Sequence, residues 1–335
     1  MTSKTHATDG TDKTDVPYVT YVINMDSAAD RMTFMKTQLD DQGVPYTRVS
    51  AVQGSKLSTA EVRANATAMC DWTCTRSTLG CAMSHRGVWR EVLRTGRAAL
   101  VLEDDAVLCP AFRDRVGEAL AACPADYDVL VLGCFFMCDV ARKYPLGLRL
   151  MRPFVSRRND TRTWTSGGTT VFVPERFAGT HAYIVSPQGA AALFKAIPRV
   201  GFHVDAQMNH PSVKLYAASP DLAFQRDMSA SSIASFDFPT IISPLLQHKD
   251  RKGISLAYYL SSPAFRVGGL DINGWLLVGL VAGLGLPGAW WPYVAGYLLL
   301  ETAAEAGGGH VGGALGPAAA YAVGFAARRR LFLSM

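Results

Sequence analysis

The first half of the chain shows two hydrophobic periods in turn, one typical of strands and one typical of helices. Residues 18–24, 98–102 and 128–133 are short apolar runs of the kind that forms buried strands. Apolar residues recur at helical spacing over residues 28–39 and 79–95. A further strand is expected at 46–52 and a further helix at 110–122. Strands that alternate with helices predict an α/β domain with a mostly parallel sheet and flanking helices.

The pattern becomes irregular and basic after this half. Residues 142–170 carry several arginines and no clear period, which predicts a long surface loop. Order returns with an apolar strand at 182–185. Ser186 and Pro187 then supply an N-cap and a first-turn proline for a helix over 188–197.

The C-terminal part differs in kind, because residues 275–300 contain no charged side chain. A second uncharged stretch at 306–327 is rich in Gly and Ala and ends at three arginines. One interpretation is a membrane hairpin, with the basic flanks and the α/β domain on the cytoplasmic side. The other is a re-entrant or buried helical pair, because Pro287 and Gly288 divide the first stretch. We expect membrane-associated hydrophobic helices over residues 271–330.

Composition narrows the class of protein. The 335 residues are 49% hydrophobic and carry a net charge of +5, without a basic stripe that would favour nucleic acid. Residues 1–16 are polar and have no apolar run, so we expect a disordered tail rather than a signal peptide.

The seven cysteines all lie between residues 70 and 138. Cys70 with Cys74 and Cys134 with Cys138 have a spacing that permits a shared four-thiolate zinc site. The odd count without a signal peptide argues against a secreted disulfide framework, so buried or free thiols are the favoured interpretation.

Three adjacent carboxylates follow the apolar run at 98–102, and they are the most informative polar feature. Glu103, Asp104 and Asp105 repel one another, which is costly unless a cation neutralises them. In an extended strand Glu103 and Asp105 point the same way and can share Mg²⁺ or Mn²⁺. The alternative is a solvated turn that begins the next helix, where acids are favourable.

Four sequence blocks carry a resemblance to a known family. They are VINMD at 22–26 followed by an Asp-Arg pair, LGCAMSH at 79–85, ALVLEDD at 99–105, and GTHAYIVSPQGA at 179–190 followed by Val-Asp at 204–205. In this order the chain resembles glycosyltransferase family 25, which includes bacterial lipopolysaccharide glycosyltransferases and collagen galactosyltransferases. The resemblance extends over about residues 18–233.

The resemblance implies a GT-A-like fold over residues 17–265, with a nucleotide-binding half at 17–135 and an acceptor half at 171–250. It implies transfer of a hexose, commonly galactose, from a UDP-sugar with inversion to a glycan, lipid-linked or protein acceptor. Such a reaction needs Mn²⁺, Mg²⁺ or basic groups at the departing diphosphate, and a general base for the acceptor hydroxyl.

The same resemblance assigns expected roles to individual residues. Glu103 and Asp105 are the expected metal ligands, and Asp205 is the expected base. The expected donor-binding residues are Asn24, Asp26, Arg31, Ser84, His85 and Asp104. Five of these residues have a plainer interpretation: Asn24 and Asp26 as a helix entry, Arg31 as a surface ion pair, His85 as a core hydrogen-bonding group, and Asp205 as a cap. His181 and His203 compete with Asp205 for the role of base or are further metal ligands.

The chain departs from the family pattern at Thr78, Ala182 and Ala206, which leaves the identity of the sugar open. Two other functions therefore stay in play. One is a catalytically degenerate module that binds a sugar nucleotide or glycan, and the other is a zinc-stabilised scaffold that uses the cysteines.

Overall fold

The computed structural model describes residues 16–144, 156–226, 263–267, 270–307 and 312–332, with residues 149, 152, 153 and 260. The tail predicted for residues 1–16 therefore lies almost wholly outside the described residues.

A central sheet of eight strands organises the first two thirds of the chain. In spatial order the strands are β2 (Thr47–Ser50), β1 (Tyr18–Asn24), β3 (Ala98–Glu103), β10 (Ala182–Val185), β5 (Val129–Val131), β11 (Leu215–Ser219), β8 (Thr169–Phe172) and β7 (Thr163–Ser166). β1 pairs parallel with β2 and β3, and β11 pairs parallel with β5. β10 enters antiparallel between β3 and β5. The predicted α/β class with a mostly parallel sheet is confirmed.

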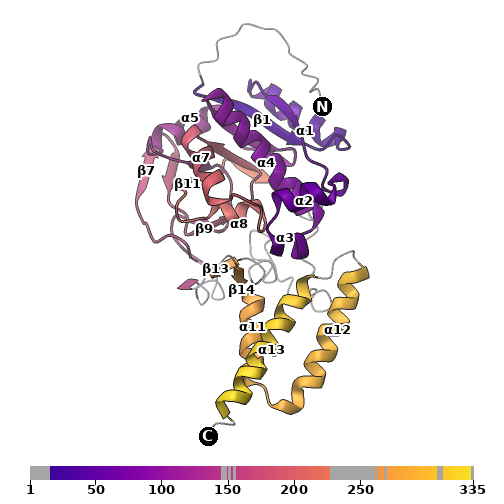
Figure 1. Ribbon diagram of the computed structural model, residues 1–335. Coiled ribbons are helices and arrows are strands. Elements are labelled where there is room, and N and C mark those ends of the chain that lie inside the picture. Colours follow the sequence, from indigo (N-terminus) through magenta and orange to yellow (C-terminus); the bar gives the residue numbers. More distant parts are fainter. Residues whose placement is uncertain are drawn as a thin grey trace.

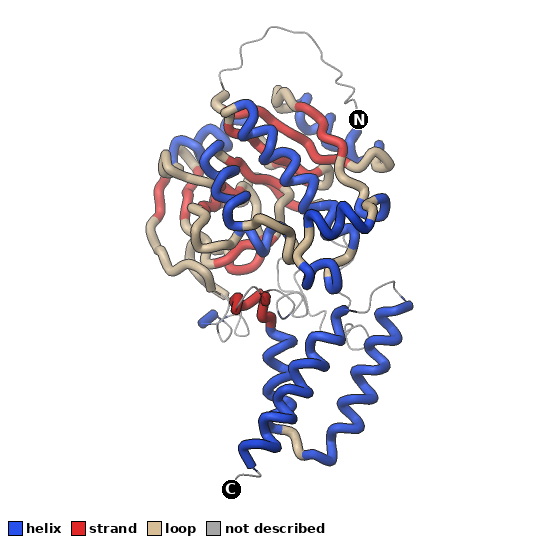
Figure 2. Tube along the Cα trace, viewed as in Figure 1, coloured by secondary structure: helices blue, strands red, loops and turns tan. Residues whose placement is uncertain are grey.

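Helices cover both faces of this sheet, because successive side chains of a strand point to opposite sides. Val101 of β3 packs on the face that holds Trp89 of α4 (Arg76–Thr95) and Leu193 of α7 (Pro187–Ala196). Leu100 packs on the other face, against Phe112 of α5 (Phe112–Ala122). α1 (Ala29–Asp41) covers that second face too. Figures 1 and 2 show the resulting arrangement of strands between helices.

Smaller elements surround one end of the sheet. They are η1 (Gly54–Lys56), α2 (Thr59–Asn65), α3 (Ala68–Thr73), α8 (Val204–Met208), and the strand pairs β4 (Ala106–Leu108) with β12 (Ala223–Gln225) and β6 (Phe135–Met137) with β9 (Arg176–Ala178). Gly80 of α4 allows close packing with the loop before η1, since a Cβ there would lie 2.5 Å from the Val52 carbonyl oxygen.

The most regular predictions agree with the structure. β1 and β10 have the predicted bounds, and Ser186 caps α7 by accepting a hydrogen bond from the Gly189 backbone N–H at 3.0 Å. The loop predicted over residues 142–170 is wrong at its end, where β7 and β8 form a hairpin that extends the sheet. β7 alternates exposed and half-buried residues, so it lacks the apolar run that marks the other strands.

The C-terminal part consists of a hairpin of β13 (Pro263–Val267) and β14 (Leu270–Asn273) followed by three helices. They are α11 (Gly274–Gly285), α12 (Trp291–Gly307) and α13 (Gly312–Phe332), with the short η3 (Gly288–Trp290) before α12. Figure 1 shows these helices extending from the α/β part.

No helix of the described residues is both long enough and apolar enough to cross a bilayer. The prediction of a transmembrane helix is therefore wrong for these residues. Pro287 ends the first candidate, because the residue before a proline avoids the helical conformation and Leu286 is extended. The 12 residues of α11 rise about 18 Å, short of a ~30 Å hydrocarbon core. α12 carries Glu301 and Glu305, and α13 is rich in Gly and Ala with arginines at its end.

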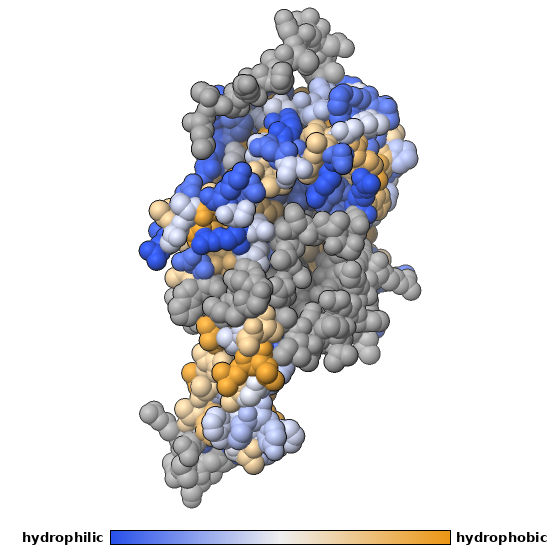
Figure 3. All heavy atoms as spheres, turned by 90° about the vertical axis from the view of Figure 1, so that its right-hand side faces the viewer, coloured by the Kyte–Doolittle hydropathy of each residue, from blue (hydrophilic) through white to orange (hydrophobic). Residues whose placement is uncertain are grey.

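α11 and α13 nevertheless pack against each other so closely that glycines of α11 lie directly against the backbone of α13. Added Cβ atoms at Gly279 and Gly283 would lie 2.4 Å from the Pro317 carbonyl oxygen and 2.2 Å from the Tyr321 carbonyl oxygen. Apolar side chains of the C-terminal helices are exposed, Val281 of α11 at 65% and Leu299 of α12 at 71%. Figure 3 shows hydrophobic surface gathered on this part of the molecule.

Four of the cysteines form two local disulfides, so the prediction of reduced thiols and the alternative of a shared zinc site are both wrong for them. Cys70 and Cys74 lie one helical turn apart with their Cα atoms at 4.7 Å, and Cys134 and Cys138 bracket β6 at 6.1 Å. Both separations are within the range that a disulfide bridges.

Candidate functional site

The polar residues singled out in the sequence gather where β1 and β3 end. Because these strands are parallel neighbours, their carboxyl ends lie at one edge of the sheet. The residues divide into two groups, one toward β1 and β2 and the other toward β10, α8 and β12.

The β1-side cluster consists of Asn24, Asp26, Arg48 and Asp104. The Asn24 amide donates to Asp104 Oδ2 at 2.7 Å and to the Ala28 carbonyl at 3.0 Å, and its oxygen accepts from Arg48 Nε at 2.7 Å. Arg48 also pairs with the exposed Asp26 at 2.6 Å, and this bond and one from Ser50 lower the Asp26 pKa. Asn24 and Asp104 are buried and bonded to protein groups, so they form the frame of this edge.

Arg31, from the first turns of α1, lies between the two groups. Its guanidinium contacts Asp104 and reaches Asp105 Oδ2 at 3.3 Å. About a third of its side chain is exposed, so the same guanidinium can meet a ligand. The acidic triplet is therefore neutralised in part by this arginine.

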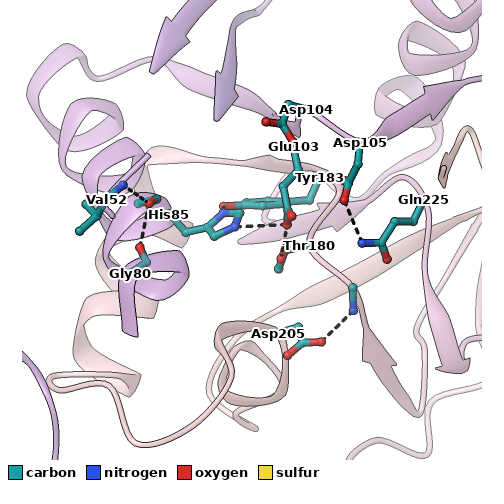
Figure 4. A network of polar contacts seen from close by, with 12 residues as sticks. Val52, Gly80, His85, Glu103, Asp104, Asp105, Thr180, Tyr183, Asp205 and Gln225 are labelled. Atoms are coloured by element: carbon teal, nitrogen blue, oxygen red, sulfur yellow. Dashed lines mark hydrogen bonds and ion pairs between the residues drawn. The ribbon is translucent and has the colours of Figure 1, made fainter. Parts of the chain in front are cut away.

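The β10-side cluster consists of Glu103, Asp105, Thr180, Asp205 and Gln225 (Figure 4). Glu103 Oε1 accepts from Thr180 Oγ1 at 2.6 Å and lies 3.4 Å from His85 Nε2. Burial alone would raise the Glu103 pKa, but the contacts with His85 and Thr180 outweigh it and lower the pKa to about 2. Glu103 is a carboxylate at neutral pH.

Asp105 is the opposite case. Burial and the charge of Glu103 raise its pKa to about 6, against the bond from Gln225 Nε2 at 3.1 Å. Asp105 Oδ1 is buried and has no hydrogen-bond partner in the described chain. A buried acceptor without a partner is costly and is typical of a ligand position.

Asp205, in the first turn of α8, is bound by backbone groups. Its Oδ2 accepts from the Gly179 N–H at 2.9 Å and its Oδ1 from the Ala206 N–H at 2.6 Å. Gly179 has φ +92, and a Cβ there would lie 2.8 Å from Phe135, so only glycine fits this turn. Residue 179 thus binds Asp205 and residue 180 binds Glu103, which brings the predicted base and the acidic triplet into one site.

Ser84 and His85 lie in the middle of α4, facing inward. Ser84 Oγ donates to the Gly80 carbonyl and accepts from the Val52 N–H, both at 2.8 Å. His85 is buried, with Nδ1 3.0 Å from the Tyr183 hydroxyl. Both residues bind protein groups, and contact with a donor stays a prediction.

The donor set fits Mn²⁺ or Mg²⁺ only if a ligand completes it. The described residues contain no group of three His, Cys, Asp or Glu side chains that could hold a metal by themselves. Asp105 Oδ1 has no protein partner, and no described hydrogen bond reaches Glu103 Oε2. Mg²⁺ is commonly held by one or two carboxylates together with substrate phosphates, and these two oxygens match that case.

His181 and His203 have other surroundings. His181 Nε2 lies 3.2 Å from the Ala223 carbonyl oxygen and its ring lies 5.2 Å from the Phe135 ring. Burial lowers the His203 pKa, against the nearby charge of Asp205.

Sequence reasoning missed Thr180 and Arg48 as members of the site. Thr180 is polar and lies two residues before a buried strand, which is a usable signal. Arg48 gives no such signal, because its partners Asn24 and Asp26 are more than twenty residues away in the chain.

Comparisons with known proteins support the resemblance to glycosyltransferase family 25. Residues 18–208 match the family model described as Glycosyltransferase family 25 (LPS biosynthesis protein). A protein of Aedes aegypti named "Glycosyltransferase 25 family member" is 27% identical over 196 residues, 56% of this chain and 29% of the relative. A protein of Anopheles gambiae with the same name is 26% identical over 196 residues, 56% of this chain and 30% of the relative. The chain thus spans less than a third of the length of these relatives. The family model covers more than half of the chain, from β1 to α8, and the chain belongs to glycosyltransferase family 25.

Proposed function

We propose that this protein transfers a hexose from a UDP-sugar to a hydroxyl group of a glycan, lipid-linked or protein acceptor. The observation that carries the proposal is the β10-side cluster. It joins a charged Glu103, an Asp105 with a buried unpartnered oxygen, and Asp205 at one edge of the sheet. Family membership supports the reaction class, since the matched region contains all three residues.

On the donor side, Glu103 Oε2 and Asp105 Oδ1 are the oxygens that would hold Mn²⁺ or Mg²⁺. Such an ion, when bound, neutralises the charge of the leaving diphosphate. Arg31 adds a fixed positive charge beside it, and its exposed part can bind a phosphate oxygen. The predicted nucleotide contacts of Asp26 and Arg31 fit this arrangement, because both side chains have exposed surface.

On the acceptor side, Asp205 is the proposed base. Two backbone N–H groups donate hydrogen bonds to the Asp205 carboxylate and hold its orientation. Neither N–H gives up its proton in the reaction. A base that takes the acceptor proton while the hydroxyl attacks from the side opposite the leaving group inverts the anomeric carbon. A GT-A-like architecture, galactose as the sugar and inversion are the finer expectations of this proposal.

We also propose that the C-terminal helices bind a membrane surface without crossing it. Each of the three helices carries exposed apolar side chains, such as Val281 of α11, Leu299 of α12 and Val323 of α13, and exposed apolar surface is a feature of membrane-binding sites. Trp290 and Tyr293 are exposed beside the turn that joins α11 to α12, where aromatic residues favour a membrane interface. Flotation of the full chain with lipid vesicles tests this proposal. Protein that stays at the bottom of the gradient while the vesicles float would contradict it. A cytoplasmic catalytic domain stays a prediction.

The activity is tested with the full chain and a panel of UDP-sugars, with and without Mn²⁺, by measuring released UDP in the presence of candidate acceptors. Release with one sugar that requires Mn²⁺ supports the proposal and names the donor. UDP binding by calorimetry without turnover for any sugar would favour the binding module. Absence of UDP binding by the folded protein would contradict the proposal.

A further inference from the structure

A buried row of side chains leads from the core of the domain to Glu103. Trp89 and His85 lie one turn apart on α4, and the Tyr183 hydroxyl, from β10, contacts both of them. Trp89 is fully buried, and His85 and Tyr183 are each 1% exposed. The contacts in order are Trp89 Nε1 to Tyr183 Oη at 3.0 Å, Tyr183 Oη to His85 Nδ1 at 3.0 Å, and His85 Nε2 to Glu103 Oε1 at 3.4 Å.

The direction of these hydrogen bonds follows from the chemistry of the first group. An indole N–H only donates, so the Tyr183 oxygen accepts from Trp89. The Tyr183 hydrogen then has His85 Nδ1 as its acceptor. A hydrogen on Nδ1 would instead place two donors against the phenol oxygen and leave the buried phenol hydrogen without an acceptor among the described contacts. The Tyr183 hydroxyl is therefore assigned as the donor to Nδ1, and the Nε2 side of the ring faces Glu103.

The end of the row is asymmetric. Thr180 Oγ1 and His85 Nε2 both approach Oε1 of Glu103, and Oε2 has no described partner. Among the described residues, His85 Nε2 has no polar partner other than this carboxylate, and at 3.4 Å the contact is longer than an ordinary N–H···O bond. Hydrogen bonds in active sites are often long without substrate and shorten when it binds.

We propose that Tyr183 and His85 are positioning residues that hold Glu103 with Oε1 toward the protein and Oε2 toward the donor. This proposal rests on the proposed function for its catalytic consequence, but not for the hydrogen-bond direction. The row acts on the orientation of one carboxylate, because His85 and Tyr183 are buried and contact protein groups.

Two variants separate positioning from simple structural support. Tyr183→Phe removes the donor to His85 Nδ1 and the acceptor of Trp89. Trp89→Phe removes the bond between Trp89 and Tyr183 but keeps the Tyr183 donor to His85. Each substitution leaves buried polar groups or core volume uncompensated, so both lower the unfolding free energy. In the UDP-release assay, Tyr183→Phe should lower kcat about tenfold with KM for the donor changed less than twofold, whereas Trp89→Phe should keep kcat.

A second measurement needs no activity. In ¹⁵N-histidine-labelled full chain without donor, the His85 ring should show its proton on Nε2 and a hydrogen-bonded Nδ1, assigned by the missing signals of His85→Gln. Trp89→Phe should leave both signals in place, and Tyr183→Phe should shift the Nδ1 signal. A proton on Nδ1 in the wild-type chain would overturn the assigned direction.

Equal kcat per folded molecule in Tyr183→Phe and Trp89→Phe would overturn the positioning role. A wild-type chain that transfers no sugar would contradict the proposed function, while the imidazole signals would still decide the hydrogen-bond direction. The two failures are therefore distinguishable.

Discussion

The two polar clusters at the end of β3 both contain carboxylate and amide side chains, but they differ in whether these polar groups have protein partners. In the β1-side cluster, Asn24 uses its amide hydrogens and its oxygen on protein groups, and Asp104 is bound by Asn24 and Arg31. In the β10-side cluster, Asp105 has a buried oxygen without a protein partner. Buried polar groups that are satisfied stabilise a fold, whereas one left unsatisfied at a sheet edge marks a ligand position. Proximity to the acidic triplet is thus not enough to assign a catalytic role.

The largest expected effect is on the β10-side cluster. Asp205→Asn removes the proposed base and keeps the size of the side chain, so kcat should fall by about 100-fold to 10,000-fold. UDP binding measured by calorimetry should stay within about twofold, because Asp205 serves the acceptor.

Asp126→Asn is the matched control, since Asp126 is an exposed partner of Lys214 at the opposite end of β5. A kcat for Asp205→Asn within threefold of the wild-type value would remove Asp205 from the mechanism.

Arg31 lies between the clusters, and its substitution measures how far the donor depends on a fixed charge. Arg31→Gln should raise the KM for the UDP-sugar about tenfold, the equivalent of about 1.4 kcal/mol for one lost charged contact to phosphate. Arg94→Gln, which removes only an exposed pair with Glu91, is the control. An unchanged KM would confine Arg31 to binding Asp104 and Asp105.

The two clusters should also differ in how pH affects stability. The folded-state pKa of Asp105, about 6, lies above its ordinary value of 3.8, so the folded chain binds more protons than the unfolded chain between these values. The contribution of Asp105 to stability therefore falls as pH rises from about 4 to 6, by about 3 kcal/mol in total.

Asp105→Asn removes this titration. Without added metal, the variant and the wild-type chain should unfold alike near pH 4, and the variant should be the more stable one at pH 7. Denaturant unfolding at the two pH values measures the difference. A variant that is less stable than wild type at pH 7 would show that the Asp105 carboxylate is satisfied after all.

The smallest effect is expected in the β1-side cluster. Arg48→Ala removes the bonds to Asn24 and Asp26 from a partly exposed side chain, at a cost of about 1 kcal/mol of unfolding free energy. Its kcat should stay within about twofold of wild type. A large loss of kcat at unchanged stability would place this cluster in the reaction and erase the distinction between the two.

The sequence predicted what is local and periodic. The bounds of β1 and β10, the cap of α7 and the three acids after β3 follow from apolar runs and capping chemistry. The structure was needed to find the β7–β8 hairpin, because β7 is too polar to show an apolar run. It was also needed to show that the C-terminal apolar stretch divides at Pro287, because hydropathy alone does not mark this division.

The residue types of the site could be predicted from the sequence, but the contacts between these residues could not. Glu103 and Asp105 were identified, but the chain turns after Glu103, and each carboxylate is set by a residue far away in the sequence, Thr180 for one and Gln225 for the other. Such contacts depend on how β10 and β12 pack beside β3 and β4, which no local pattern encodes. The opposite pKa directions of two carboxylates two positions apart have the same origin.

The most direct test is the Mn²⁺ dependence of UDP release by the wild-type chain and by Asp105→Asn, in the presence of the donor sugar and acceptor that the panel identifies. Wild-type release should rise with Mn²⁺ to saturation, and Asp105→Asn should remain folded but release UDP about 100-fold more slowly at every concentration. Equal, metal-independent release by both chains would contradict this prediction and would make the acidic triplet a structural feature held by Arg31.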